Sequence, residues 1–194
     1  YTVYGTGDLV IDTHIVPKRE LPHLPRLGLQ MGLPGDFEYF TWYGRGPHEN
    51  YIDKKESAKV GLYSGTVTEQ LEPYIRPQEN GNKSDVRWAA LTNLQGMGLL
   101  VVGQPTLNVS VHHFTAEDFT RARHTYDLVP RDETILNMDY AQGGLGSNSC
   151  GPGPLEKYQL KPEEVSFTVR LKPFFGKVST PMKLYRQRIE LIKW

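Results

Sequence analysis

Two segments of the sequence concentrate side chains that could bind a ligand or react with one. Each joins arginine, glutamate and asparagine to aromatic residues in a loop that contains glycine and proline. Turns are built from glycine, proline, asparagine and aspartate, so arginine and tryptophan exceed what a turn requires. Residues 42–51 supply Trp42, Tyr43, Arg45, His48, Glu49, Asn50 and Tyr51. Residues 74–88 supply Tyr74, Arg76, Glu79, Asn80, Arg87 and Trp88.

This combination of side chains could bind a carbohydrate. Aromatic faces cover the C–H surface of a sugar, while a few planar polar groups bind its hydroxyls. The residues alone are equally consistent with aromatic core residues and turn asparagines. Both interpretations stay open at this point.

Glycoside hydrolysis requires two carboxylates roughly 5–10 Å apart, and Glu49 and Glu79 are the best local candidates. Arg45 precedes Glu49 and Arg76 precedes Glu79, which predicts two ion pairs and a lowered pKa for each carboxyl. A general acid needs the opposite shift. We therefore expect the two carboxylates to brace their loops or bind hydroxyls rather than to catalyse.

A third segment, Gly143–Pro152, is rich in glycine and serine. No lysine follows its glycines and no helical pattern comes after it, so we do not expect it to bind phosphate. We expect no metal site either, since the adjacent His112 and His113 would point to opposite faces of a strand. Cys150 is the only cysteine, which excludes an internal disulfide, and the loop offers no cation to activate its thiol.

The composition narrows the possible partners. The chain has 194 residues, with 22 Lys+Arg and 22 Asp+Glu, a length that suits one domain with a core. Nucleic acids and anionic membranes attract positive surfaces, so a net charge of zero argues against both. No apolar run approaches the roughly 20 residues of a membrane-spanning helix. Because the chain opens at Tyr1 inside an apparent strand, we expect it to be a piece of a longer polypeptide.

Alternating apolar and polar residues predict an antiparallel all-β sandwich over residues 1–175. We expect a hairpin at 2–16 and strands at 26–31, 37–43, 86–93, 97–104, 107–113, 133–140 and 165–171. Residues 51–67 read as irregular. One helix is predicted at Thr115–His124, capped by Thr115 and Asp118. The C-terminal extension, residues 176–194, is compatible with a helix or a last strand from Met182 onwards.

Segments Trp42–Tyr51, Pro73–Trp88 and Gly143–Pro152 occur in the order of the signature segments of a known family. They resemble the C-terminal β-sandwich domain (small-chain or domain 5 type) of glycoside hydrolase family 2 β-galactosidases, with similarity from about Val3 to Leu171. The resemblance implies a galactose-mutarotase-like β-supersandwich. It also implies that the domain is incomplete at the N-terminus, because the family domain begins with further strands.

The resemblance implies a part in the hydrolysis of terminal β-galactosides with retention, within a larger homo-oligomeric enzyme. The family's catalytic glutamates lie in a separate barrel domain, so no catalytic residue is expected in this chain and the fragment alone should be inactive. The expected partners are β-galactosides and the rest of the parent chain. No cofactor is expected in this segment, although the parent enzyme could use Mg or Na. The resemblance leaves the compartment open between the cytoplasm and the periplasm of a bacterium.

In the resembled family, the loop that matches Gly143–Pro152 reaches into the galactose pocket. This implies a site-shaping role for Ser147, Asn148, Ser149 and Cys150. Some family members carry a tryptophan at the position of Cys150, and the smaller cysteine loses area for stacking on a sugar.

Three alternatives remain for the isolated chain. The first is a free-standing carbohydrate-binding module, which would bind sugar through Arg87 and Trp88. The second is a mutarotase-like epimerase, with His48 or His113 as acid and Glu79 as base. The third is a purely structural interface domain, which would neither bind sugar nor turn it over.

Overall fold

The structure, a computed structural model, describes residues 1–147 and 151–187. Its strands are β1 (Thr2–Val3), β2 (Leu9–Ile15), β3 (Arg26–Pro34), β4 (Tyr39–Gly46), β5 (Lys59–Thr66), β6 (Lys83–Thr92), β7 (Met97–His112), β8 (Glu133–Gln142) and β9 (Val165–Phe175). Two short α-helices, α1 (Ala116–Arg121) and α2 (Pro181–Tyr185), accompany single 3-10 turns η1 (Thr68–Gln70), η2 (Thr125–Asp127) and η3 (Glu156–Tyr158).

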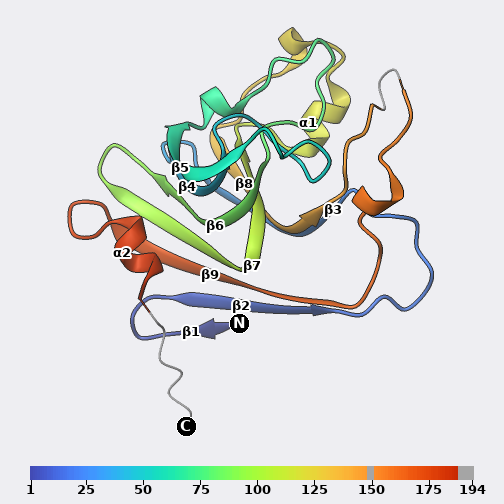
Figure 1. The fold of residues 1–194 in the computed structure, drawn as a ribbon. Coiled ribbons are helices and arrows are strands. Elements are labelled where there is room, and N and C mark those ends of the chain that lie inside the picture. Colours follow the sequence, from blue (N-terminus) through green and yellow to red (C-terminus); the bar gives the residue numbers. More distant parts are fainter. Residues whose placement is uncertain (148–150, 188–194) are drawn as a thin grey trace.

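The long strand β7 connects two halves of an antiparallel β structure (Figure 1). From Met97 to Gln104 it pairs with β9, and from Asn108 to His112 it pairs with β8. Strand β6 lies along its other edge. On the β9 side, the sheet continues from β9 to β2 and β1. On the β8 side, β3 pairs with the outer edge of β8. Beyond β6, the sheet continues to β4 and β5. The described residues therefore form an all-β, sandwich-like domain, as the sequence predicts.

Side chains that alternate along the strands fill two hydrophobic clusters on opposite faces. Phe40 and Trp42 of β4 stack in the larger cluster, with ring centroids 4.8 Å apart. On the other face, Trp88 and Leu100 pack beneath Leu184 of α2. Burial on both faces makes the central strands rigid supports for the loops at their ends.

Most predicted elements are confirmed. The hairpin of β1 and β2 closes through a hydrogen bond from Tyr4 N to Asp8 O. The helix α1 has the predicted capping box between Thr115 and Asp118, but it ends at Arg121 because the backbone is already extended at Ala122, with ψ of 132°.

Two predictions need correction, and the open choice for the C-terminal extension falls to the helix. Residues 51–67 are not wholly irregular, because β5 occupies Lys59–Thr66 and forms an edge beside β4. The two strands predicted at 97–104 and 107–113 are one strand, β7. Of the C-terminal extension, residues 181–185 form the helix α2, and residues 188–194 lie outside the described part.

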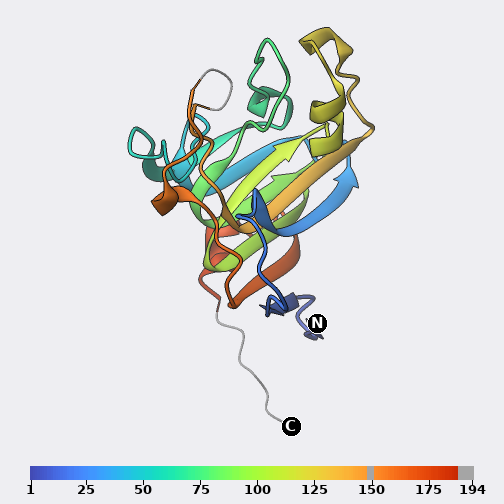
Figure 2. The ribbon, with the colours of Figure 1, turned by 90° about the vertical axis from the view of Figure 1, so that its right-hand side faces the viewer.

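Four connections gather at one end of the domain (Figure 2). They are the loops after β4, after β5, after β7 and after β8. The N-terminus lies at the opposite end. Among the described residues, no helix has the length and apolar character needed to cross a membrane.

A buried carboxylate ties the N-terminal hairpin to β9. Asp8 Oδ1 accepts a hydrogen bond from Arg170 Nε at 2.7 Å, and Asp8 Oδ2 accepts one from Lys172 Nζ at 2.8 Å. Arg170 also donates to the carbonyls of Leu184 and Gln187, beside α2. Burial raises the pKa of Asp8, but the hydrogen bonds from its cationic partners outweigh this effect, and the pKa is lowered.

Replacing Asp8 by Asn should lower the free energy of unfolding by about 3 kcal/mol, because Arg170 and Lys172 would stay buried without a countercharge. The pKa of Asp8 in the folded state lies below its ordinary value of 3.8. The stabilisation is therefore complete above that value and is lost as the pH falls through the folded-state pKa. Urea denaturation at neutral and acidic pH measures both effects. Asp12→Asn, at an exposed carboxylate, is the control and should change little; equal losses in both variants would contradict the argument.

Strand β3 contains two glycines with different surroundings. A β-carbon at Gly28 would lie 2.3 Å from the Asp139 Cα in β8, whereas one at Gly32 would meet nothing closer than 3.8 Å. Gly28→Ala should therefore cost about 2–3 kcal/mol through overpacking, while Gly32→Ala should be nearly neutral. Thermal unfolding of the two variants tests this difference, and equal stability would rule out the close approach of β3 and β8.

Candidate functional site

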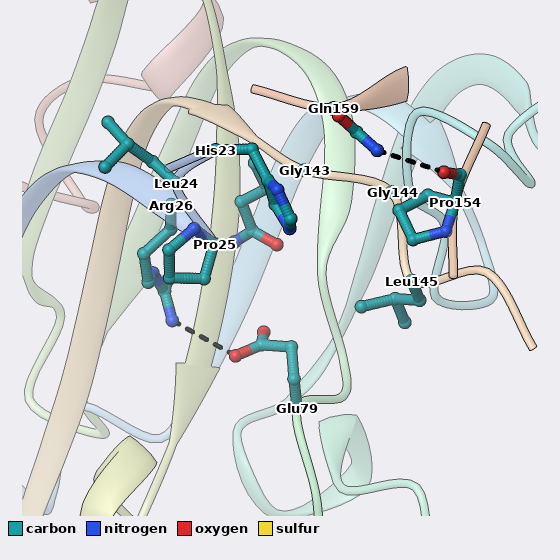
Figure 3. A pocket seen from close by; sticks show the side chains of 11 residues that line it. His23, Leu24, Pro25, Arg26, Glu79, Gly143, Gly144, Leu145, Pro154 and Gln159 are labelled. Carbon is teal, nitrogen blue, oxygen red and sulfur yellow. Dashed lines mark hydrogen bonds and ion pairs between the residues drawn. The ribbon is translucent and has the colours of Figure 1, made fainter. Parts of the chain in front are cut away.

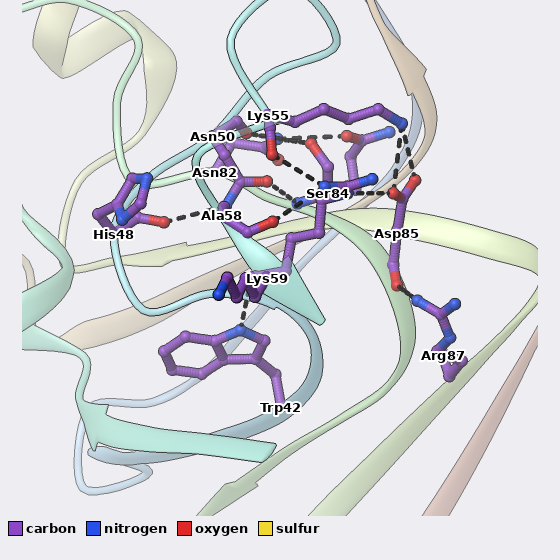
Figure 4. Close-up of polar contacts among 12 residues, drawn as sticks. Trp42, His48, Asn50, Lys55, Ala58, Lys59, Asn82, Ser84, Asp85 and Arg87 are labelled. Atoms are coloured by element: carbon purple, nitrogen blue, oxygen red, sulfur yellow. Dashed lines mark hydrogen bonds and ion pairs between the residues drawn. The ribbon is translucent and has the colours of Figure 1, made fainter. Parts of the chain in front are cut away.

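Asn50 fastens the loop after β4 to the start of β6. Its Oδ1 accepts a hydrogen bond from Ser84 N at 2.9 Å, and its backbone carbonyl accepts one from Asn82 Nδ2 at 2.8 Å. Its own Nδ2 donates to the His48 carbonyl (Figure 4). Because Asn50 and Asn82 are buried, this exchange holds the two predicted functional segments side by side.

Arg45 stabilises the same loop, but not through Glu49 as the sequence predicts. Its Nε donates to Asp85 Oδ2 at 2.5 Å, and its Nη1 donates to the carbonyls of Lys55 and Ala58. Lys55 Nζ also binds Asp85 (Figure 4). The predicted Arg45–Glu49 pair is wrong because the β4 side chain at position 45 faces Asp85 at the entry to β6.

Glu49 is buried and receives donors from three segments. Lys54 Nζ lies 2.9 Å from its Oε1, the Tyr74 hydroxyl donates to the same oxygen, and Gly81 N donates to Oε2 at 2.8 Å. Burial raises the pKa of Glu49, but these hydrogen bonds and the Lys54 charge outweigh it, so the pKa is lowered. The predicted direction is confirmed with different partners, and this carboxylate is a structural anchor.

Glu79 forms its ion pair with Arg26, not with Arg76. Arg26 Nη1 lies 3.1 Å from Glu79 Oε2, and Arg26 also forms a two-point pair with Asp139, at 2.5 Å and 3.3 Å. Gln142 Nε2 donates to Asp139 Oδ2 at 2.8 Å. The sequence prediction is wrong here because Arg76 is exposed, whereas β3 carries Arg26 beneath Glu79.

The pKa of Glu79 is raised, against the prediction. Burial is the largest cause, and the negative charges of Asp139 and Glu49 add to it, while Arg26 opposes it. The Glu79 side chain is still 32% exposed. Glu79 therefore combines access to a ligand with a pKa nearer to neutrality than that of Glu49, and the electrostatic argument against it as a proton donor no longer holds.

Tyr51 lies between these carboxylates and is fully buried. Burial is the main cause of its strongly raised pKa, and Glu79 and Glu49 raise it further. The hydroxyl therefore stays protonated. Among the described residues, its oxygen has no hydrogen-bond partner. A fully buried tyrosine supports the loops rather than offering its ring to a sugar.

A cavity of about 270 Å³ opens beside Glu79 (Figure 3). One wall comes from the segment before β3, and the opposite wall comes from the loop after β8. Pockets for small molecules usually measure about 300–1,000 Å³, so the space suits one small polar ring. The lining residues are His23, Leu24, Pro25, Arg26, Glu79, Gln142, Gly143, Gly144, Leu145, Pro154 and Gln159.

Backbone and carboxylate contacts hold the loop after β8 in place. Gly143 N donates to the Pro25 carbonyl at 2.9 Å, and Gly144 N donates to the Tyr158 carbonyl at 2.7 Å. Asp53 Oδ2 accepts a hydrogen bond from Gly146 N at 2.7 Å. Ser147 is exposed. The other three predicted loop residues, Asn148, Ser149 and Cys150, lie outside the described part of the chain.

Several predicted site residues lie away from this cavity. Trp88 is 2% exposed and packs under α2. Arg87 lies over the Tyr43 ring, 5.7 Å from its centroid, and donates to the Asp85 carbonyl. His48 is exposed and contacts the Ser57 hydroxyl. Asn80 supports its own loop through the Glu72 amide. Trp88 is therefore a core residue beneath α2 and does not line this cavity.

The sequence analysis missed Arg26 and Asp139. A charged residue inside the predicted strand 133–140 was a usable signal for Asp139, because a buried carboxylate needs a cationic partner. Arg26 gave no comparable signal, since arginine at the start of a strand is unremarkable. Its role depends on the pairing of β3 with β8, which brings positions 26 and 142 together.

The cavity can bind hydroxyl groups through an ionisable carboxylate, a guanidinium and carboxamides. Within residues 1–147 and 151–187, no three His, Cys, Asp or Glu residues are arranged to hold a metal ion.

Comparison with known proteins finds a β-galactosidase family and individual β-galactosidases. The sequence pattern of the family described as Beta galactosidase small chain matches residues 1–171. A β-galactosidase of Priestia megaterium is 41% identical over 148 residues, 76% of this chain and 14% of that protein. A β-galactosidase of Staphylococcus xylosus is 34% identical over 170 residues, 88% and 17% of the two chains. One of Kluyveromyces lactis is 33% identical over 168 residues, 86% and 16%.

The chain thus spans only about a sixth of the length of the curated relatives it matches. The matched region contains strands β1 to β8, β9 as far as Leu171, and the walls of the cavity beside Glu79. From the extent of this match and the level of identity, the chain belongs to the β-galactosidase small chain family.

Proposed function

We propose that this chain is the C-terminal domain of a larger retaining β-galactosidase, where it helps to complete the galactoside-binding site. The observation that carries the proposal is the cavity beside Glu79, which joins an accessible carboxylate to Arg26 and a glycine-rich loop. The named relatives are β-galactosidases of which such a domain forms a minor part. The catalytic acid and nucleophile would then belong to the rest of the enzyme.

In this function, Glu79 and Arg26 would bind sugar hydroxyls, and Gly143–Leu145 would close one side of the site. The Arg26–Asp139 pair supports the proposal, because it fixes the guanidinium while leaving one of its nitrogens for Glu79. Glu49, Asn50 and Tyr51 would hold the loops in position. The natural ligands would be β-galactosides, and the physical partner would be the remainder of the enzyme, itself a homo-oligomer.

The finer architecture that we propose is a galactose-mutarotase-like β-supersandwich, continued upstream by further strands of the parent chain. Strand β1 pairs only with Leu9 and Val10 of β2, which supports this view because the rest of the outer edge of β2, in the described residues, keeps backbone groups that another strand could pair with. Cofactors such as Mg or Na would belong to the rest of the enzyme.

The contacts do not favour a mutarotase-like enzyme. His113 Nε2 lies 2.7 Å from Glu38, and His48 contacts Ser57. Neither histidine is paired with Glu79, so the proposed acid and base do not face each other. A free-standing carbohydrate-binding module would need an exposed aromatic platform, and Trp88 does not supply one because it is buried.

The purified chain should not hydrolyse a chromogenic aryl β-galactoside, and mixing it with the rest of the parent enzyme should restore activity. The reason is that the chain would supply one wall of the site but not the reacting groups. Initial rates for each part alone and for the mixture test this. Hydrolysis by the isolated chain that Glu79→Gln abolishes would contradict the proposal and make Glu79 catalytic.

In the complete enzyme, Arg26→Lys should raise KM for the galactoside about tenfold, because lysine keeps the charge but cannot bridge Glu79 and Asp139 with a planar fork. Arg76→Lys is the matched control at the position that sequence proximity suggests, and it should leave KM unchanged. Steady-state kinetics of the two variants decide between the arginines. A larger effect at Arg76 would place the sugar on the outer side of the loop, away from the cavity.

A further inference from the structure

His112, the last residue of β7, supports the loop that carries Glu79. It is 3% exposed, and its Nε2 lies 2.9 Å from the carbonyl oxygen of Asn80. The ring also meets Phe119 of α1 edge to face, with centroids 5.3 Å apart. The strand end and the helix therefore fix the imidazole from two sides.

The protonation of His112 follows from its surroundings. A carbonyl oxygen can only accept a hydrogen bond, so Nε2 carries the hydrogen. Burial lowers the pKa of His112 to about 4, against the raising effect of its hydrogen bond to Asn80. The ring is therefore neutral at neutral pH, with Nε2 as its one donor. This N–H group donates its hydrogen bond to the backbone of the loop that carries Glu79.

The loop fits closely against the ring. Gly81 has a φ of +75°, a conformation that glycine adopts without strain. A β-carbon at Gly81 would lie 2.7 Å from His112 Cε1 and equally close to the Gln70 carbonyl. The backbone at positions 80 and 81 can thus rest directly on the imidazole only because residue 81 is glycine.

These contacts continue to both carboxylates. Gly81 N donates to Glu49 Oε2 at 2.8 Å, and Glu79 is the residue immediately before Asn80. The Asn80 side chain closes the loop on itself, donating to the Gln78 carbonyl at 2.8 Å. Asn80 and Gly81 therefore fix the position of the Glu79 backbone. His112 in turn fixes the position of Asn80 and Gly81.

We propose that His112 is a positioning residue, which holds Glu79 at the cavity by donating a hydrogen bond to the Asn80 carbonyl. The inference rests on the proposed function, because Glu79 must contact the sugar for its position to matter. Neighbouring His113 has no such role, since it points away from Asn80 and binds Glu38 and the Glu133 carbonyl.

The test uses the complete β-galactosidase and two variants of His112 whose side-chain amides differ in their distance from the backbone. In His112→Gln, the side-chain amide can occupy the place of Nε2 and donate to Asn80, so kcat/KM should stay within about threefold. In His112→Asn, the amide is too short, and kcat/KM should fall about tenfold, mainly through KM. Thermal unfolding of both variants is measured alongside the kinetics. His113→Asn is the control and should keep wild-type kinetics.

A double-mutant cycle with Glu79→Gln then shows whether the effect passes through Glu79. If it does, His112→Asn should cost little in the Glu79→Gln enzyme, because the group that it positions is already altered. Additive losses, or equal kinetics for the Gln and Asn variants, would overturn the inference while leaving the proposed function intact. A Glu79→Gln enzyme with unchanged kinetics would overturn the proposed function, and the role of His112 with it.

Discussion

The burial of the Glu49 carboxylate is the constraint on which the loop end of the domain depends. A buried charge is unfavourable unless hydrogen bonds and a countercharge replace the water that it loses. Its donors come from Lys54, Tyr74 and Gly81, which belong to different turns of two loops. Those loops cannot separate without leaving the carboxylate unsatisfied. Together with the buried Asn50, this carboxylate fixes loops that contain few apolar residues of their own.

Glu49 and Glu79 share a local sequence, Glu-Asn after a proline-containing turn, yet they have opposite pKa shifts. Burial raises the pKa of both carboxyls, and the difference lies in how far their partners offset that effect. Glu49 has three donors of its own, whereas Glu79 shares Arg26 with a second carboxylate, Asp139. A carboxylate at a cavity that is incompletely neutralised can still accept hydrogen bonds from a ligand. A carboxylate whose oxygens already accept hydrogen bonds from protein donors can only stabilise the loops around it. The same dipeptide thus provides a saturated anchor in one loop and, in the next, an accessible carboxylate that serves as a binding group in the proposed function.

Much of the fold could be predicted from the sequence, because strands covered on one face impose a period of two that is visible without a structure. The capping box at Thr115 is equally local. Strand β5 was missed because its exposed edge carries lysine, glycine and serine instead of a clear alternation. The two loops that contain Glu49 and Glu79 could be singled out, but the sequence assigned their ion pairs to neighbouring residues. Arg26 and Asp139 lie 53 and 60 positions from Glu79 in the chain, and only the pairing of β3 with β8 brings them together.

Strand β7 has a consequence for how the domain opens. Its backbone is paired on one edge with β6 and on the other with β9 and then β8. Much of its backbone is therefore paired along both edges, and separating either half of the domain would disturb strands that also belong to the other. Hydrogen exchange at the paired positions of β7 should therefore follow the opening of large parts of the domain rather than local fluctuation. The loops around the cavity and the packing beneath α2 are thus joined through one strand, and damage at the end near the N-terminus should lower the population of correctly placed loops at the other end.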